Sequence, residues 1–131
     1  MPWVAATEIQ KVLKVGGFVF IETQFSYSSH ERPWHFFQFS DMGLRALFNE
    51  SLEFDLVESG MSNPISGYFD HNADSYLKHQ PVTEFYCHSE ILRQKRCEVD
   101  SFVWTSVAID GVVEGSRYPA PRAAQPASPR I

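Results

Sequence analysis

Residues 2–23, PWVAATEIQKVLKVGGFVFIET, decide the fold class of this 131-residue chain. Apolar residues recur at helical spacing in the first part of the stretch, which predicts an amphipathic helix over residues 2–15. Gly16 can adopt the left-handed conformation that ends a helix. The short apolar run FVFI at residues 18–21 then predicts a strand that is buried on both faces. A helix followed directly by such a strand is typical of an α/β fold.

A second helix and a second strand follow this pair. Ser40 or Asp41 can cap a short helix whose apolar stripe lies within residues 44–48. Polar and apolar side chains alternate over residues 53–58, which predicts a strand that ends at residues 59–60. The order helix, strand, helix, strand implies a right-handed crossover and strands that run in parallel.

The remainder of the chain is less regular. Residues 61–82 contain many turn-forming residues and predict an irregular connection. Residues 83–95 fit either a strand or a helix, and periodicity alone leaves both open. Residues 102–109 are another run rich in β-branched and aromatic residues. We therefore expect one ordered domain over residues 1–114, followed by a flexible tail with several Pro and Arg residues over residues 115–131.

Composition excludes several classes of function. The net charge of −5 and the absence of a basic cluster argue against a nucleic-acid-binding protein. Cys87 and Cys97 have neither zinc-site nor redox-motif spacing, so we expect reduced thiols. No apolar run approaches the roughly 18 residues that a membrane span requires, and the start of the sequence does not read as a signal peptide. The expected location is therefore cytoplasmic.

A resemblance to a known family agrees with this outline. Residues 8–21 resemble the E-x-x-R-V-L-K-P-G-G-x-x-x-I segment of class I S-adenosylmethionine (SAM)-dependent methyltransferases, with Val15 in place of the proline. In that family the segment is the helix before the fifth strand and the fifth strand itself, in a Rossmann-like sheet ordered 3-2-1-4-5-7-6 whose seventh strand is antiparallel. Residues 54–61 are similar to the sixth strand, and residues 86–95 to the seventh, which favours a strand there.

The resemblance implies a partial Rossmann-like sheet, made of the fifth to seventh strands with flanking helices. Residues 1–114 are then the carboxy-terminal half of a methyltransferase-like domain. The family binds SAM at a D/E-x-G-x-G-x-G loop after the first strand, and no two glycines of this sequence have G-x-G spacing. We therefore identify no cofactor-binding residue and expect that the chain alone does not bind SAM. The resemblance implies a truncated domain that is active only with a second polypeptide.

The loop at residues 24–40 carries the candidate substrate site. Its aromatic density exceeds that of ordinary solvent-facing loops, which favours either binding or packing against the sheet. Its second half resembles the H-x-x-P-x-D-Y-W-R-F-T loop of methyltransferases associated with glycan biosynthesis, with His35 and Gln38 at the acidic and basic positions of the pattern. The resemblance implies a small-molecule or glycan-linked methyl acceptor. The candidate acceptor-binding residues are His30, Trp34, His35, Phe36 and Gln38.

No catalytic or metal-binding residue is assigned. Glu22 follows the predicted strand and could act as a general base, but a carboxylate at a strand end is more often solvated. Cys87 and His88 are adjacent, so on a strand they would point to opposite faces. The remaining histidines lack Cys or carboxylate partners at ligand spacing, and we expect no metal site.

Two partners other than the acceptor are considered. Without a fourth strand beside it, the strand at residues 18–21 would lie at a sheet edge with unpaired backbone groups, which predicts self-association or pairing with a complementing chain. The alternative function is a non-catalytic α/β interaction module or accessory subunit, in which the aromatic loop binds a protein rather than a substrate.

Overall fold

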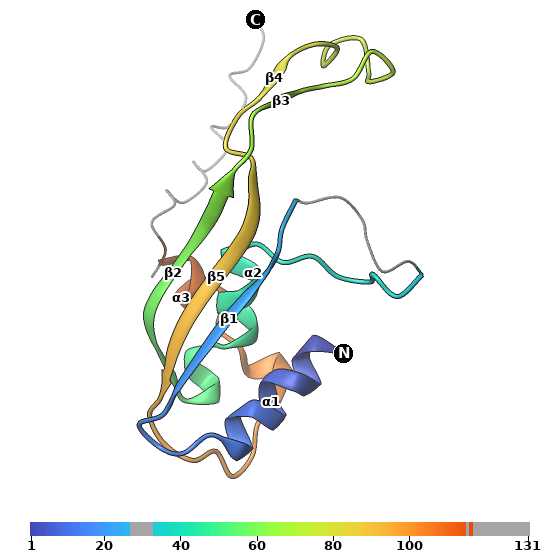
Figure 1. Cartoon of the computed structure of the whole chain (residues 1–131). Coiled ribbons are helices and arrows are strands. Elements are labelled where there is room, and N and C mark those ends of the chain that lie inside the picture. The colour runs from blue at the N-terminus through green and yellow to red at the C-terminus, as the bar shows by residue number, and fades with distance from the viewer. Residues whose placement is uncertain (27–32, 115, 117–131) are drawn as a thin grey trace, which may run out of the picture.

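A computed structural model of the chain describes residues 1–26, 33–114 and 116, and these form a mixed α/β fold (Figure 1). A three-stranded sheet carries the helices on one side, and a small two-stranded hairpin extends beyond one end of the sheet (Figure 1). Most of the predicted tail and His30 lie outside the described residues. The elements in chain order are α1 (Pro2–Val12), β1 (Phe18–Gln24), α2 (Asp41–Leu47), η1 (Glu50–Leu52), β2 (Phe54–Pro64), β3 (Gly67–Tyr68), β4 (Pro81–Val82), β5 (Tyr86–Lys95), η2 (Trp104–Ser106) and α3 (Ile109–Glu114).

The strand order in the main sheet is β1-β5-β2, and β5 is antiparallel to both neighbours. In this register Ile91 of β5 lies between Ile21 of β1 and Ser59 of β2. Because both outer strands oppose β5, β1 and β2 run in the same direction, as the helix and strand order predicts. The segment that fitted either helix or strand is thus the central strand.

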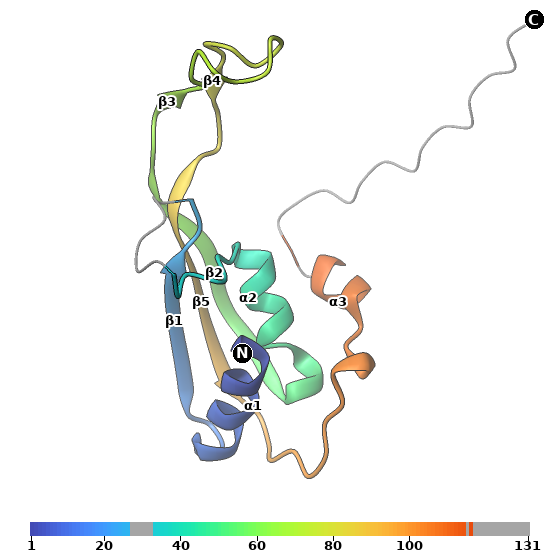
Figure 2. The ribbon, with the colours of Figure 1, turned by 90° about the vertical axis from the view of Figure 1, so that its right-hand side faces the viewer.

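The hydrophobic core lies between the sheet and the helices. α1, α2 and α3 are all on the same face of the sheet (Figure 2). The centre of the core is formed by Ala6, Phe48, Leu52 and Phe54, and the rings of Phe48 and Phe54 meet edge to face at 5.7 Å. Burial of each large side chain contributes about 1.5–3 kcal/mol to folding. The predicted cap of α2 is confirmed, since the Ser40 hydroxyl accepts a hydrogen bond from the Gly43 amide at 3.1 Å.

The prediction that residues 18–21 are buried on both faces is wrong. Val19 and Ile21 pack against the core, whereas Phe18 and Phe20 are 55% and 59% exposed. The continuous apolar run predicted helices on both sides of the sheet, but the described residues supply helices on one side only. We call the uncovered side the open face; β1 contributes Phe18, Phe20 and Glu22 to it, and the paired register adds Glu90 and Leu92 from β5.

Three predicted boundaries also differ. α1 ends at Val12 because Leu13 takes an extended backbone with ψ 134°, so Lys14 lies outside the helix. Gly16 does have positive φ, at +78°, but in the turn that leads into β1. β2 continues past the predicted end at residues 59–60 as far as Pro64, with a bulge between Leu56 and Glu58.

The remaining segments also depart from expectation. The irregular connection at residues 61–82 contains the end of β2 and the β3–β4 hairpin. The apolar run at residues 102–109 forms the 3-10 turn η2 and the start of α3, not a strand, and Phe102 and Trp104 pack edge to face at 4.9 Å.

Lys95, at the end of β5, joins the sheet to α1. Its side chain is fully buried, and Nζ donates to the carbonyl oxygens of Gln10 and Leu13, each at 2.7 Å. Nζ also pairs with the Glu98 carboxylate at 2.6 Å. The final carbonyls of a helix lack partners within the helix and carry its negative dipole end, so a buried ammonium group stabilises them. Lys95 therefore fixes where α1 ends.

We expect Lys95→Met to lower the free energy of unfolding by about 2–3 kcal/mol, because two buried carbonyl groups lose a charged donor. Urea denaturation followed by circular dichroism measures this difference. Lys78→Met removes an exposed lysine and is the matched control, expected to change stability by less than about 0.5 kcal/mol. Equal effects of the two substitutions would contradict the capping role.

Candidate functional site

The predicted acceptor loop displays two aromatic rings. Trp34 and Phe36 are 75% and 69% exposed, and their rings meet edge to face at 6.4 Å. His35 and Gln38 line a shallow pocket together with Phe36 and Phe37. The structure therefore brings His35, Phe36 and Gln38 together and places Trp34 against Phe36. Their role in acceptor binding stays a prediction.

The carboxyl-terminal part of the same loop packs onto the fold. Phe37 stacks on Phe39 at 5.9 Å and meets Trp3 of α1 edge to face at 5.9 Å. The backbone of Phe39 is held at both polar groups: its amide donates to the Gln24 carbonyl at 3.3 Å, and its carbonyl accepts from the Ser89 hydroxyl at 2.6 Å. The packing hypothesis thus describes Phe37 and Phe39, whereas exposure leaves Trp34 and Phe36 available for binding.

A polar cluster lies where the loop leaves β1. His88 pairs with Gln24 across the sheet, and its Nδ1 lies 2.8 Å from the amide Nδ2 of Asn63 and 3.8 Å from a carboxylate oxygen of Glu22. Ser62 donates to the Glu90 carboxylate beside it. With the Asn63 amide donating to Nδ1, the neutral ring carries its proton on Nε2. We refer to Glu22, Ser62, Asn63, His88 and Glu90 as the polar cluster.

Glu22 and His88 lie 66 positions apart in the sequence, and no local pattern links them. The residues come from three strands whose antiparallel register was not predictable from periodicity. The one usable signal was the spacing of two residues on β5, which puts His88 and Glu90 on one face. An imidazole held in this way can donate a hydrogen bond to a ligand through its Nε2–H group. Among the described residues, no three His, Cys, Asp or Glu side chains converge as a metal-ligand set.

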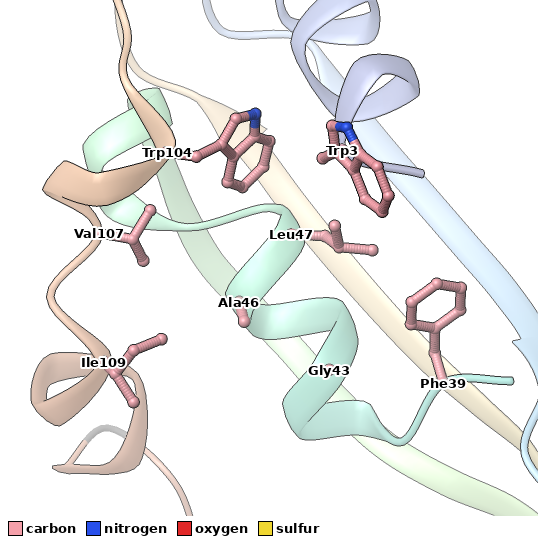
Figure 3. Close-up of a pocket in the computed structure, with 8 residues that line it drawn as sticks. All are labelled: Trp3, Phe39, Gly43, Ala46, Leu47, Trp104, Val107 and Ile109. Carbon is pink, nitrogen blue, oxygen red and sulfur yellow. The ribbon is translucent and has the colours of Figure 1, made fainter. Parts of the chain in front are cut away.

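An apolar pocket of about 500 Å³ lies on the opposite side, in the helical layer (Figure 3). The indoles of Trp3 and Trp104 stand at one end, with Phe39 and Ile109 further along (Figure 3). The pocket can bury an apolar group, but it has few polar groups to orient a ligand. Its lining consists of Trp3, Phe39, Gly43, Ala46, Leu47, Trp104, Val107 and Ile109.

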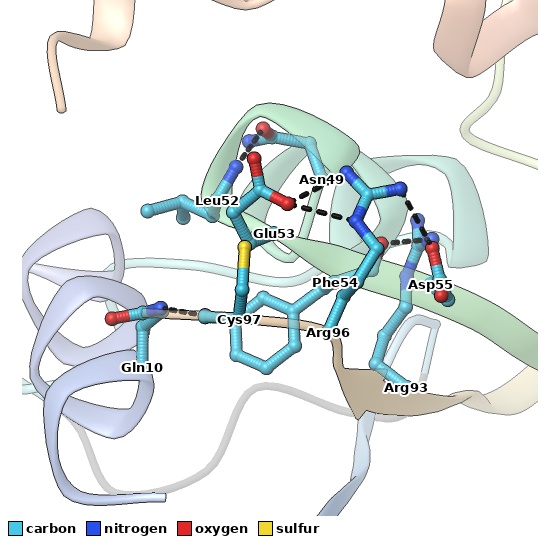
Figure 4. A network of polar contacts seen from close by, with 9 residues as sticks. All are labelled: Gln10, Asn49, Leu52, Glu53, Phe54, Asp55, Arg93, Arg96 and Cys97. Carbon is cyan, nitrogen blue, oxygen red and sulfur yellow. Dashed lines mark hydrogen bonds and ion pairs between the residues drawn. The ribbon is translucent and has the colours of Figure 1, made fainter. Parts of the chain in front are cut away.

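A second polar network closes the other end of the sheet (Figure 4). Arg96 donates from Nε to the Glu53 carboxylate at 2.8 Å and from Nη1 to Asp55 at 3.2 Å. Hydrogen bonds from the Cys97 thiol and then from Arg96 hold the pKa of Glu53 below its ordinary value of 4.5. The same carboxylate raises the pKa of the Cys97 thiol above 9.0, which disfavours the reactive thiolate. This network is structural, since it joins β2 to the segment after β5.

The lowered pKa of Glu53 makes its contribution to stability dependent on pH. The folded state favours the ionised carboxylate, so the contribution is complete above pH 4.5 and is lost as the pH falls through the folded-state pKa. We expect Glu53→Gln to lower the free energy of unfolding at pH 7 and to make no difference at the acid end. Urea titrations between pH 7 and pH 3 measure the difference in free energy of unfolding between wild type and Glu53→Gln. Glu84→Gln, which changes an exposed glutamate, is the control. A pH-independent difference would contradict the assignment.

No protein-family model, curated protein or solved structure matches this chain. In the described part of the chain, no helix is long and apolar enough to cross a membrane.

Proposed function

We propose that these residues are the carboxy-terminal half of a class I SAM-dependent methyltransferase domain that acts on a small-molecule or glycan-linked acceptor. The observation that carries the proposal is the strand order β1-β5-β2 with an antiparallel central strand. The family's sheet ends in the order 5-7-6 with an antiparallel seventh strand. The strand that resembles the seventh in sequence is thus the central one, between those that resemble the fifth and sixth.

The residues present do not fit SAM itself. A nucleotide-like cofactor needs a glycine turn that leads from a strand into a helix, so that backbone amides can approach it closely. Among the described glycines, Gly16 alone has positive φ, and it precedes a strand instead of following one. We propose that a polypeptide segment outside these 131 residues carries the cofactor site.

In this proposal the chain supplies the acceptor side of the site. In open α/β sheets, ligands bind at the carboxyl ends of the parallel strands. Both the aromatic loop and the polar cluster lie at the carboxyl end of β1, because Gln24 leads into the loop and pairs with His88. Trp34 and Phe36 would stack on the acceptor, and side chains of the polar cluster would form hydrogen bonds with its hydroxyl or amine.

We expect calorimetric titration of the full chain with S-adenosylhomocysteine to give no saturable heat, because the described residues contain no glycine turn of the kind that binds the cofactor. An intact methyltransferase in the same buffer is the positive control. Saturable one-to-one binding would contradict the half-domain proposal. The genomic sequence directly upstream provides a second measurement: an open frame encoding D-x-G-x-G-x-G supports the proposal, and its absence favours the alternative below.

The alternative function is a non-catalytic interaction module, and the open face is the observation that favours it. The exposed Phe20 lines a hollow of about 320 Å³ together with Glu58, Gly60 and Glu90, and Phe18 is exposed on the same face of β1. A Cβ added at Gly60 would meet nothing within 4 Å, so a partner's side chain has room there. Exposed apolar side chains next to a sheet edge are typical of association surfaces.

The edge position of β1 predicts self-association of the chain, in the half-domain proposal as well as in the alternative. We expect wild-type protein to dimerise as its concentration rises, and Phe20→Lys to remain monomeric because a lysine on an edge strand opposes pairing. Val57→Lys places the same charge at a half-exposed position on the other outer strand and is the control, expected to dimerise as wild type. Sedimentation velocity measures the association, and a wild-type monomer at high concentration would refute it.

A further inference from the structure

Two buried arginines face one small cavity beneath α2. Arg45 of α2 and Arg93 of β5 are 6% and 3% exposed. They line a cavity of about 90 Å³ together with residues of η1, of α3 and of the segment just before α3. Buried guanidinium groups are normally paired with carboxylates, because an uncompensated buried charge is costly. The partners of these two side chains are therefore informative.

Neither arginine has an adequate partner in the described part of the chain. Arg93 donates to the carbonyl oxygens of Phe54 and Arg45 at 3.3 and 3.4 Å, which are long bonds to uncharged acceptors. The Nε atoms of both arginines are buried without any acceptor. No carboxylate of the described residues lies within ion-pair distance of either guanidinium, although six other ion pairs are formed.

The two charges also act on each other. Burial first, and then the neighbouring Arg45 charge, lower the pKa of Arg93 to about 10, although the charges of Glu50 and Asp55 act in the opposite direction; Arg93 remains protonated at neutral pH. Two protonated guanidiniums therefore share one cavity, with two buried N–H donors unused. An anion in the cavity would relieve the repulsion between the two charges, although the two buried Nε atoms themselves have almost no accessible surface.

We propose that this cavity binds one small tetrahedral oxyanion, a phosphate or sulfate group. A cavity of about 90 Å³ has room for a single such group and excludes a nucleotide. Guanidinium donors from two different elements suit a tetrahedral group, whose oxygens point in several directions, better than a planar carboxylate. This site is separate from the proposed acceptor site and does not depend on the proposed function.

The walls of the cavity support this assignment. Asn49 is held in place, since its amide donates to the Ala46 carbonyl at 2.8 Å and its Oδ1 accepts from the Leu52 amide at 3.1 Å. Ser51 brings a hydroxyl to the lining. Glu50 also lines the cavity, but its side chain belongs to an exposed residue at the rim. Its charge opposes an anion, which makes it the most useful position to change.

The experiment is calorimetric titration of the full chain with inorganic phosphate at constant ionic strength, balanced with chloride. We expect saturable binding that tightens about threefold in Glu50→Gln, where a repulsive surface charge is removed. Arg45→Met should weaken binding at least tenfold. Lys78→Met, which removes an exposed lysine without an ion pair among the described residues, controls for net charge and should bind as wild type.

Several outcomes would overturn the proposal. These are heats that match a chloride titration, binding unchanged in Arg45→Met, or binding that does not tighten in Glu50→Gln. Acetate binding as tightly as phosphate would overturn the tetrahedral assignment. If Arg45→Met does not fold, Glu50→Gln decides the matter, because that residue is exposed and its substitution leaves the core intact.

Discussion

The fold depends on the pairing of β5 with both outer strands. β1 and β2 never pair with each other, so each obtains its sheet partner only when residues 86–95 join them. Closing the loop between β1 and β5 costs chain entropy. This cost is offset only when β5 pairs with the outer strands and the contacts of the sheet form. Lys95 then extends the dependence to α1, whose last carbonyls it binds. The sheet and its first helix are therefore expected to form together in one cooperative step.

The same arrangement determines where a ligand can be bound. Covering only one face of the sheet leaves Phe18 and Phe20 exposed and leaves the polar cluster accessible. The aromatic loop begins at the carboxyl end of β1, next to His88, and packs back through Phe39. The helical side offers instead an apolar pocket and a cationic cavity. The acceptor site that we propose therefore lies at the loop end of the sheet.

The sequence predicted local features better than relations between strands. The strand at residues 18–21 and the Ser40 cap follow from adjacent residues, and both are present. The burial of that strand was wrongly predicted, because an apolar run cannot reveal whether a second layer of helices exists. The polar cluster was missed for a similar reason, since it needs the register of three strands. The Arg45 and Arg93 pair joins residues 48 positions apart, and no local pattern indicates such a contact.

Lys95 and Arg93 lie two residues apart on the covered face of β5, and the contrast between them separates a structural cation from a functional candidate. Lys95 has three N–H donors and three acceptors, one of them a carboxylate, so its burial is fully compensated. Arg93 is nearly as buried but has two long bonds, an unused Nε and a second cation beside it. Folding alone explains the first arrangement. The Arg93 arrangement lowers the stability of the fold when the cavity is empty. Hydrophobic residues of similar size at these positions would give a more stable fold. The Arg45 and Arg93 pair is therefore the arrangement that the proposed anion would complete.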